Sequence, residues 1–358
     1  MKLLLLPAIM VLVLVSGCTI PGTTIDIPFI PNFFGPNIQE ETHDVIVIQN
    51  LQAIPSAEVR SGQTVTLRAF IKNQQNPELG PKGNVKIVLY NTCELFDVDT
   101  RSSFCTMGKE VSMQKDQISG AYYCTIEKMF PQSTAVAEWS LKARDVKVQT
   151  PCRIGIMAQY TYFTPTTYRI TFINKQELER LVTQGKSAGV SGIEGVAGEG
   201  PVKTFMEVPN QPIVYDTNDG GSGILSLWIE NKGFGQLAIP SRANIYFATR
   251  DGECQTISET DTPETTRQIC IDIYPSQGDV GDLLLAGDGR SLKDCFREKI
   301  GETTALIGKS TPKYSCEITS PVDSKIKLQK TFQINSEISY LYKFTQEIDL
   351  KIKPGVSL

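Results

Sequence analysis

Histidine is almost absent from this chain of 358 residues, which contains one, His43. A Ser-His-Asp triad or a two-histidine metal site needs histidine inside a cleft, with its partners within hydrogen-bond reach. His43 instead follows a proline-rich stretch directly, which is a poor position for such a site. We therefore expect no histidine-based catalysis and no cofactor.

An excess of charge of one sign is also missing. The formal net charge is −4, and acidic and basic residues are dispersed along the chain. This pattern argues against nucleic acid as a partner and offers no polybasic arm for anionic lipid. Hydrophobic residues make up 41% of the chain and charged residues 21%, which predicts packed cores, and the length predicts two or three domains.

No apolar run is long enough to cross a bilayer easily. The run Leu3–Val15 has 13 residues, against the ~20 that a membrane-spanning helix needs. It follows Lys2 and precedes small residues, as in a secretory signal. Val15-Ser16-Gly17-Cys18 resembles the lipobox of bacterial-type lipoproteins, which archaea also use. The resemblance implies that residues 1–17 are removed and that the sulfur of Cys18 carries the lipid. A plain secretory signal and an uncleaved anchor are the alternatives.

The nine cysteines include no Cys-x-x-Cys pair, so their spacing does not favour structural zinc. Apart from Cys18, they form two groups of four, and two disulfides per group would use every thiol outside the cytosol. The odd cysteine is then the lipidated one. The disulfide candidates are Cys93, Cys105, Cys124, Cys152, Cys254, Cys270, Cys295 and Cys316.

Residues 18–42 are predicted to form a lipid-anchored tether, because recurring prolines favour an extended, semi-rigid chain. We expect its apolar side chains to lie on the lipid, on a partner or on the first domain. They are Ile27, Phe29, Ile30, Phe33 and Phe34.

Short stretches with period-two alternation and turn residues between them predict strands of an antiparallel sandwich. Residues 43–173 are predicted to form one β-sandwich module and residues 202–358 a second one. A helix capped by Asn174 and a glycine-rich linker fill 174–201. The expected strands include 65–72, 85–90, 135–141, 153–163, 168–173, 204–208 and 224–230, and a short helix is expected at 291–300.

Two segments resemble strands of immunoglobulin-like, adhesion-related modules on archaeal and bacterial envelope proteins. They are Ser61–Leu67 leading into Phe70–Asn73, and Leu225–Gly233. The resemblance implies a mainly all-β fold of two tandem immunoglobulin-like sandwiches. Either a duplicated module or one long pairing explains why the two halves resemble each other.

One segment, Asp216–Gly221, has the oxygen-rich composition of a calcium loop, with Asp216, Asn218 and Asp219 as weak candidate ligands. Its twelfth position is Leu227 rather than glutamate, and an acidic hairpin turn is the simpler alternative, so we assign no metal.

We therefore predict a non-catalytic envelope lipoprotein on the extracytoplasmic face of the cell membrane, with a structural or binding role. Cys18 would hold it to membrane lipid, and its partner would be a protein or glycan of the cell surface. A glycan hydrolase is one alternative, which needs two carboxylates about 5 to 10 Å apart. A solute-binding lipoprotein of a transporter is the other, and such proteins normally show alternating strands and helices.

Overall fold

The computed structural model describes residues 43–75, 84–188, 195–237, 245–247, 269–275, 285–286, 289–301, 309–320 and 326–355. The segment of residues 1–17, Cys18, the rest of the tether and Cys254 lie outside these ranges. Thr42–Leu358 form one compact unit, defined by the contacts between residues in space.

Five strands form a first antiparallel sheet in the order β1–β3–β9–β5–β6. In β3, Val65, Leu67, Ala69 and Ile71 are buried and the residues between them are more exposed. This alternation turns one face of the sheet toward the core. The strands are β1 (Ile46–Ile54), β3 (Thr64–Asn73), β9 (Thr134–Ala143), β5 (Phe96–Thr106) and β6 (Glu110–Ser112).

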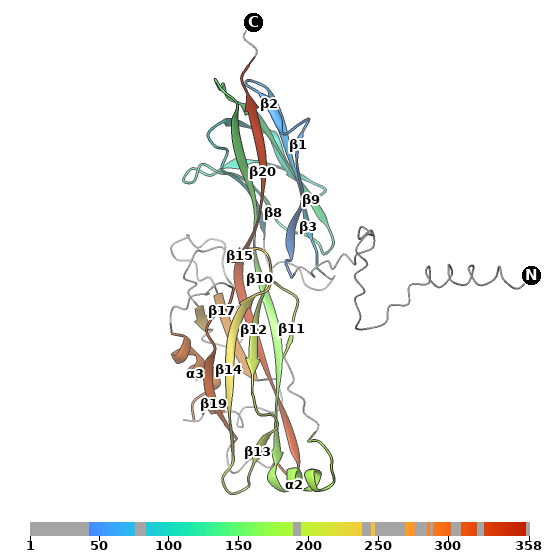
Figure 1. Cartoon of the computed structure of the whole chain (residues 1–358), viewed down its shortest axis with the longest axis vertical. Helices are drawn as coiled ribbons and strands as arrows, with labels where there is room; N and C mark the ends of the chain where they lie inside the picture. Colours follow the sequence, from blue (N-terminus) through green and yellow to red (C-terminus); the bar gives the residue numbers. More distant parts are fainter. Residues whose placement is uncertain are drawn as a thin grey trace, which may run out of the picture. The chain divides into compact units, whose positions relative to one another are not determined.

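Two strands of 25 residues each, β10 (Thr150–Asn174) and β20 (Gln329–Lys353), form the middle of a central sheet. They pair antiparallel, with Thr150 opposite Ile352 at one end and Ile173 opposite Gln329 at the other. At about 3.4 Å per residue, this ladder extends about 80 Å. Figure 1 shows the two strands running side by side.

The sequence predicted a break in β10 between 163 and 168, and the structure shows one continuous strand. The carbonyl oxygen of Pro165 accepts a hydrogen bond of 2.7 Å from the Gly198 N–H. The nitrogen of Pro165 therefore also faces away from β20, because the N and O atoms of one residue in a strand point to the same side. Its missing N–H removes no hydrogen bond between β10 and β20, so proline is tolerated here.

Further strands extend the central sheet on both sides of this pair, in the order β16–β17–β20–β10–β4–β8–β7. They are β4 (Val85–Tyr90), β7 (Gln114–Lys115), β8 (Tyr122–Ile126), β16 (Ile245–Phe247) and β17 (Ile269–Pro275). Four short strands pair with β10 or β20: β2 (Glu58–Arg60), β11 (Val196–Ala197), β13 (Ile213–Tyr215) and β15 (Gln236–Leu237). Strand β11 falls inside the predicted glycine-rich linker.

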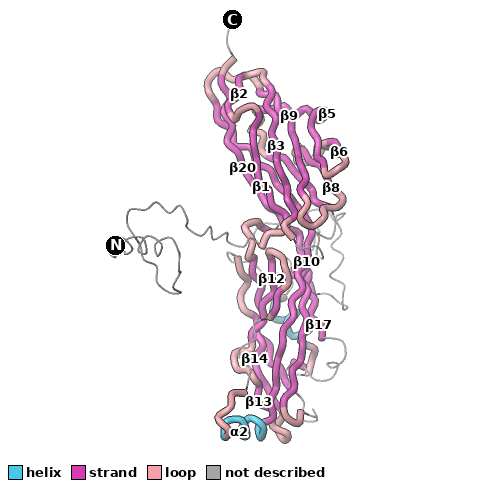
Figure 2. The backbone as a smooth tube through the Cα atoms, turned by 90° about the vertical axis from the view of Figure 1, so that its right-hand side faces the viewer, coloured by secondary structure: helices cyan, strands magenta, loops and turns pink. Residues whose placement is uncertain are grey.

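A third antiparallel sheet has the order β12–β14–β19–β18. Its strands are β12 (Val202–Glu207), β14 (Gly221–Asn231), β18 (Leu285–Ala286) and β19 (Tyr314–Ser320). The first sheet packs on the part of the central sheet that contains β4 and β8, and the third sheet packs on the part beside β11 (Figures 1 and 2).

The predicted mainly-β sandwich architecture is confirmed, with one difference: both sandwiches use β10 and β20. The end of β20 thus belongs to the first sandwich, where Lys351–Lys353 pairs in parallel with Glu58–Arg60 of β2. The boundaries at 173 and 202 stay predictions.

The two helices in the described ranges lie where they were predicted, and each begins after a side-chain cap, of which Asn174 was predicted. In α2 (Lys175–Thr183), Oδ1 of Asn174 accepts a hydrogen bond of 2.9 Å from the Gln176 N–H. In α3 (Leu292–Ile300), the hydroxyl of Ser291 accepts one of 3.1 Å from the Asp294 N–H. A side-chain acceptor at this position satisfies an N–H that the helix leaves unpaired.

A buried polar cluster joins Asp44, near the start of the described residues, to the turn after β14. Asp44 is 2% exposed, and its carboxylate accepts hydrogen bonds from the N–H groups of Phe234 (2.8 Å) and Gly235 (3.4 Å). The hydroxyl of Tyr342 donates to Oδ1 of Asn231 at 3.0 Å. Burial and then the negative charge of Asp44 raise the pKa of Tyr342, which therefore stays a neutral donor.

Candidate binding surface

The outward face of the third sheet gathers aromatic and charged side chains. In β14, Leu225, Leu227 and Ile229 are buried, whereas Trp228 and Glu230 alternate with them and are partly exposed. Strand β12 pairs with β14 in register, so that Phe205 lies opposite Trp228 and Lys203 opposite Glu230. The sheet thereby brings together residues that are distant in the sequence.

The rings of Phe205 and Trp228 stack, with centroids 5.5 Å apart and planes inclined by 16°. The ammonium group of Lys313 lies 4.3 Å from the centroid of Trp228, and that of Lys232 lies 5.2 Å from the centroid of Phe205. Contacts of this kind are favourable because the face of an aromatic ring carries partial negative charge. We call Lys203, Phe205, Trp228, Lys232 and Lys313 the aromatic–lysine face.

Two glutamates hold these groups in place. Glu230 accepts a hydrogen bond of 2.7 Å from Nε1 of Trp228 and forms an ion pair with Lys232, and Glu207 pairs with Lys313 at 2.7 Å. Burial raises the pKa of Glu230, but the hydrogen bonds from Lys232 and Trp228 outweigh it and leave the pKa below its usual value. Glu230 is therefore charged at neutral pH.

The surroundings of Lys203 disfavour its protonated form. Burial lowers the pKa of its ammonium group, the charge of Lys232 lowers it further, and Glu199 offsets this in part. Partial burial and a like charge both disfavour the protonated form of a lysine.

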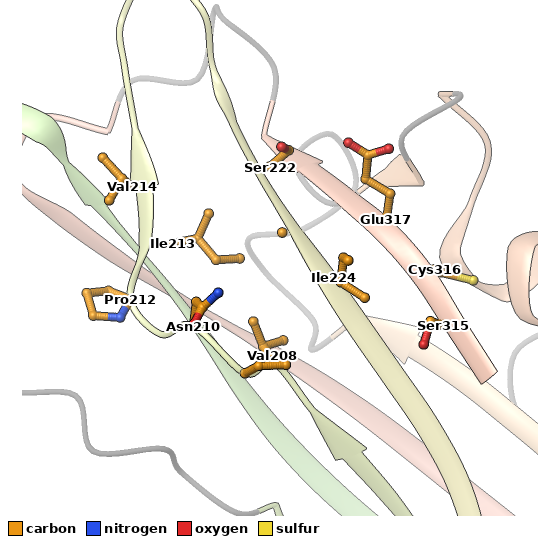
Figure 3. A pocket seen from close by; sticks show the side chains of 12 residues that line it. Val208, Asn210, Pro212, Ile213, Val214, Ser222, Ile224, Ser315, Cys316 and Glu317 are labelled. Carbon is orange, nitrogen blue, oxygen red and sulfur yellow. The ribbon is translucent and has the colours of Figure 1, made fainter. Parts of the chain in front are cut away.

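An apolar groove with a cavity volume of about 760 Å³ lies where β12 ends (Figure 3). Strand β12 pairs with β14 as far as Glu207 opposite Ser226, and the chain then leaves the sheet and returns as β13 beside β10. The pairings of Gly221–Leu225 therefore all go to β19, and the other side of this stretch faces the groove.

Apolar side chains are unusually exposed in this groove. Val214 is 44% exposed and Ile224 57%, and both are among its lining residues. Figure 3 shows Ile213 and Val208 beside Ile224, with Glu317 on the β19 side. Glu317 is the one acidic residue among the described residues that line the groove.

Three disulfides cross-link the described residues, and they join Cys93 to Cys152, Cys105 to Cys124, and Cys295 to Cys316. The Cys105–Cys124 bond connects the first sheet to the central sheet through β5 and β8, and Cys295–Cys316 connects α3 to β19. Cys18 and Cys254 lie outside the described residues, as does the side chain of Cys270, so lipidation and the fourth pairing remain predictions.

The weak calcium candidates form a tight turn in which Asp216 pairs with Gly220 as an isolated bridge. The carboxylate of Asp216 accepts hydrogen bonds from the Asn218 N–H (2.9 Å) and from Lys175 Nζ (3.3 Å), which together hold its pKa below the usual value. Within the described ranges, no group of three or more histidine, cysteine, aspartate or glutamate residues could hold a metal ion. The turn alternative accounts for these three residues.

The glycan-hydrolase alternative needs a general acid with a raised pKa. Every carboxyl group with a resolved shift in the described part of the chain has a lowered pKa. The described residues therefore give this alternative no support.

The aromatic–lysine face was not predicted from the sequence. Trp228 and Glu230 alternate along β14 and Lys232 follows its end, which was a usable signal for one outward row. Lys313 lies 85 positions after Trp228 in the chain, and only the pairing of β14 with β19 brings the two together.

Comparisons with known proteins give no family assignment: no family model and no curated protein match the chain. Among solved structures, the major pilin SpaA of Corynebacterium diphtheriae is 12% identical over 36% of this chain and 41% of the pilin chain, with a TM-score of 0.26. The C-terminal domain of the Streptococcus agalactiae antigen I/II polypeptide BspA is 9% identical over 86% of this chain and 96% of that domain, with a TM-score of 0.21.

A third match is AvmM, which catalyses macrocyclization in alchivemycin A biosynthesis. It is 14% identical over 44% of this chain and 91% of its own, with a TM-score of 0.22. This chain spans less than half of the SpaA chain. At such TM-scores the similarities carry no argument about function.

None of the helices in the described ranges has the length and apolar character needed to span a membrane.

Proposed function

We propose that this chain is a lipid-anchored protein of the cell envelope, held at the extracytoplasmic face of the membrane by Cys18, with an adhesive or structural role. The observation that carries the proposal is the groove beside β14, which leaves Val214 and Ile224 exposed. Contiguous exposed apolar surface on a soluble module is typical of an interaction site.

The three disulfides support an extracytoplasmic location, because such bonds persist in oxidising compartments. The proline-rich tether at 18–42 would give the folded part reach away from the bilayer. A structural or adhesive protein needs both of these properties.

The groove suits an extended protein segment as its occupant. Gly221–Leu225 offers a sheet edge whose described pairings lie on one side only, and apolar side chains line the space beside that edge. Strand addition uses this combination, with main-chain hydrogen bonds for affinity and apolar pockets for specificity.

The anchor is tested by mass spectrometry of the mature protein from the membrane fraction. We expect an N-terminal peptide that begins with a lipid-modified Cys18, and we expect Cys18→Ser to move the protein to the soluble fraction. An unmodified Cys18 in the wild-type protein would reject the anchor.

The groove is tested by attaching the protein to beads and measuring bead retention on cells of the producing strain. Ile224→Lys places a charge in the groove and is expected to reduce retention several-fold. Val148→Lys is the control, because Val148 is 69% exposed in the turn between β9 and β10, away from the groove. Equal retention of the two variants would contradict a role for the groove.

A further inference from the structure

The lysines of the aromatic–lysine face hold positive charges at defined positions. Lys232 and Lys313 each lie over an aromatic ring, which restricts the freedom of two long side chains. Next to them, Lys309 donates a hydrogen bond of 3.0 Å to the Gly233 carbonyl oxygen and lies 5.7 Å from the ring centroid of Phe234. Phe234 is 56% exposed.

Positive charge locally exceeds negative charge, although the whole chain carries −4. Four lysines, namely Lys309 and the three of the face, are accompanied by three glutamates. Glu230 and Glu207 pair with Lys232 and Lys313, and Glu199 acts on Lys203. Burial is the main cause of the lowered pKa of Lys203, and the nearby charge of Lys232 lowers it further. An anion bound beside both lysines would relieve this repulsion.

The arrangement fits an extended ligand better than a small ion. The ammonium groups of Lys232 and Lys313 flank the stacked rings and are at most about 15 Å apart, which is the length of the three centroid distances laid end to end. A linear polymer with repeated negative groups can contact several of these lysines and lie along both aromatic rings at once.

The neighbouring row on the sheet is hydroxylated. The hydroxyls of Ser226 and Ser315 lie opposite each other, 2.9 Å apart, beside the aromatic pair. Hydroxyl groups both donate and accept hydrogen bonds, and aromatic rings offer apolar contact to the C–H groups of sugar rings. Ammonium groups, aromatic rings and hydroxyls on an open sheet together match the chemistry of an acidic sugar polymer.

We infer that the aromatic–lysine face binds an acidic polysaccharide, whose carboxylate or sulfate groups pair with Lys203, Lys232 and Lys313 while its sugar rings lie along Phe205 and Trp228. The inference deepens the proposed function and rests on the protein being exposed outside the cell. Ser315 lines the groove as well, but Lys203, Lys232 and Lys313 do not, so the lysines can be changed without altering the lining of the groove.

The test measures binding of the full chain, in detergent micelles, to immobilised polygalacturonate, dextran sulfate and neutral dextran. We expect binding to at least one of the two acidic polymers and none to neutral dextran. The stronger of the two acidic polymers identifies the anionic group. The double substitution Lys203→Gln and Lys232→Gln is expected to weaken that binding at least tenfold.

The matched control is Lys86→Gln with Lys115→Gln. These lysines also lie over aromatic rings, those of Tyr123 and Tyr122, but they belong to the central sheet. The control variant should bind like the wild type, and circular dichroism should show that both variants are folded. An equal loss in both variants, or binding to neither acidic polymer, would overturn the inference. Polyglutamate bound as tightly as the polysaccharides would also overturn it, in favour of an acidic protein partner.

These outcomes separate the inference from the proposed function. Lipidation of Cys18 and bead retention through Ile224 do not depend on the lysines, so absent polysaccharide binding with an intact anchor and groove would reject the inference alone.

Discussion

Asp44 is buried between the start of β1 and the turn after β14. Its carboxylate accepts two main-chain N–H groups, from Phe234 and Gly235. Asp44→Ala leaves these groups without that acceptor in a site closed to water, and we expect a loss of about 2 to 4 kcal/mol in the free energy of unfolding by urea. Asp349→Ala is the control, because its side chain is 67% exposed and pairs with Arg153 at the surface. We expect Asp349→Ala to lower the free energy of unfolding by at most about 1 kcal/mol. Equal losses in the two variants would contradict the structural role of Asp44.

Among single residues, the sequence predicted those whose partners are close to them in the chain. Asn174 was predicted as a helix cap because a cap depends on neighbours within a few residues. Asp44 was not recognisable, since its partners lie 190 and 191 positions away. The aromatic–lysine face was missed for the same reason, and the lipidation of Cys18 stays a prediction.

At the scale of elements, alternation predicted β3, β4 and β9, but not the extent of β10. A proline within a strand argues against the interior of a sheet unless its nitrogen faces a free or irregular edge. The edge that Pro165 faces is formed by Gly198 and β11, some thirty residues later in the chain. Local sequence patterns therefore could not show that proline is tolerated at this position.

The disulfides offer a test at this scale. Chain entropy alone predicts a cost of about 3 kcal/mol for losing a bond that closes 19 residues and about 4 for one that closes 59. Cys105, Cys124 and Cys152 are 0%, 1% and 2% exposed, whereas Cys93 is partly exposed. Loss of the Cys105–Cys124 bond therefore removes two buried side chains from the core, and loss of the Cys93–Cys152 bond removes one. We expect Cys105→Ala with Cys124→Ala to cost at least as much as Cys93→Ala with Cys152→Ala in urea unfolding. A clearly larger cost for the second pair would mean that loop length dominates.

The parallel contact of β2 with the end of β20 predicts acid sensitivity. The hydrogen bond from Lys353 and the charges of Lys353 and Lys351 lower the pKa of Glu58 below its model-peptide value of 4.5. As the pH falls, the carboxylate of Glu58 is therefore protonated in the unfolded chain before it is protonated in the folded one. Its contribution to the free energy of unfolding is complete above pH 4.5 and is lost as the pH falls through the folded-state pKa. The gap in urea midpoint between wild type and Glu58→Gln should narrow from pH 7 to pH 3. Lys353→Gln should show the same narrowing, and a constant gap would exclude the effect.

For the whole molecule, the shared strands decide how it unfolds. Independent tandem modules would melt separately, but β10 and β20 each contribute side chains to both sandwiches. Disordering one half would leave the other with two frayed central strands and exposed apolar faces. We therefore expect one cooperative transition for residues 43–355, despite the length of the chain.

The chain's two tryptophans make this measurable, because Trp139 is buried in the first sheet and Trp228 lies on the third. Trp139→Phe leaves a fluorescence reporter in one half, and Trp228→Phe leaves a reporter in the other. In urea, the fluorescence of each variant should change at the same midpoint as its own circular dichroism signal, since each reporter then follows the whole unit. If the fluorescence and circular dichroism midpoints differ within a variant, the halves unfold independently and the long strands do not couple them.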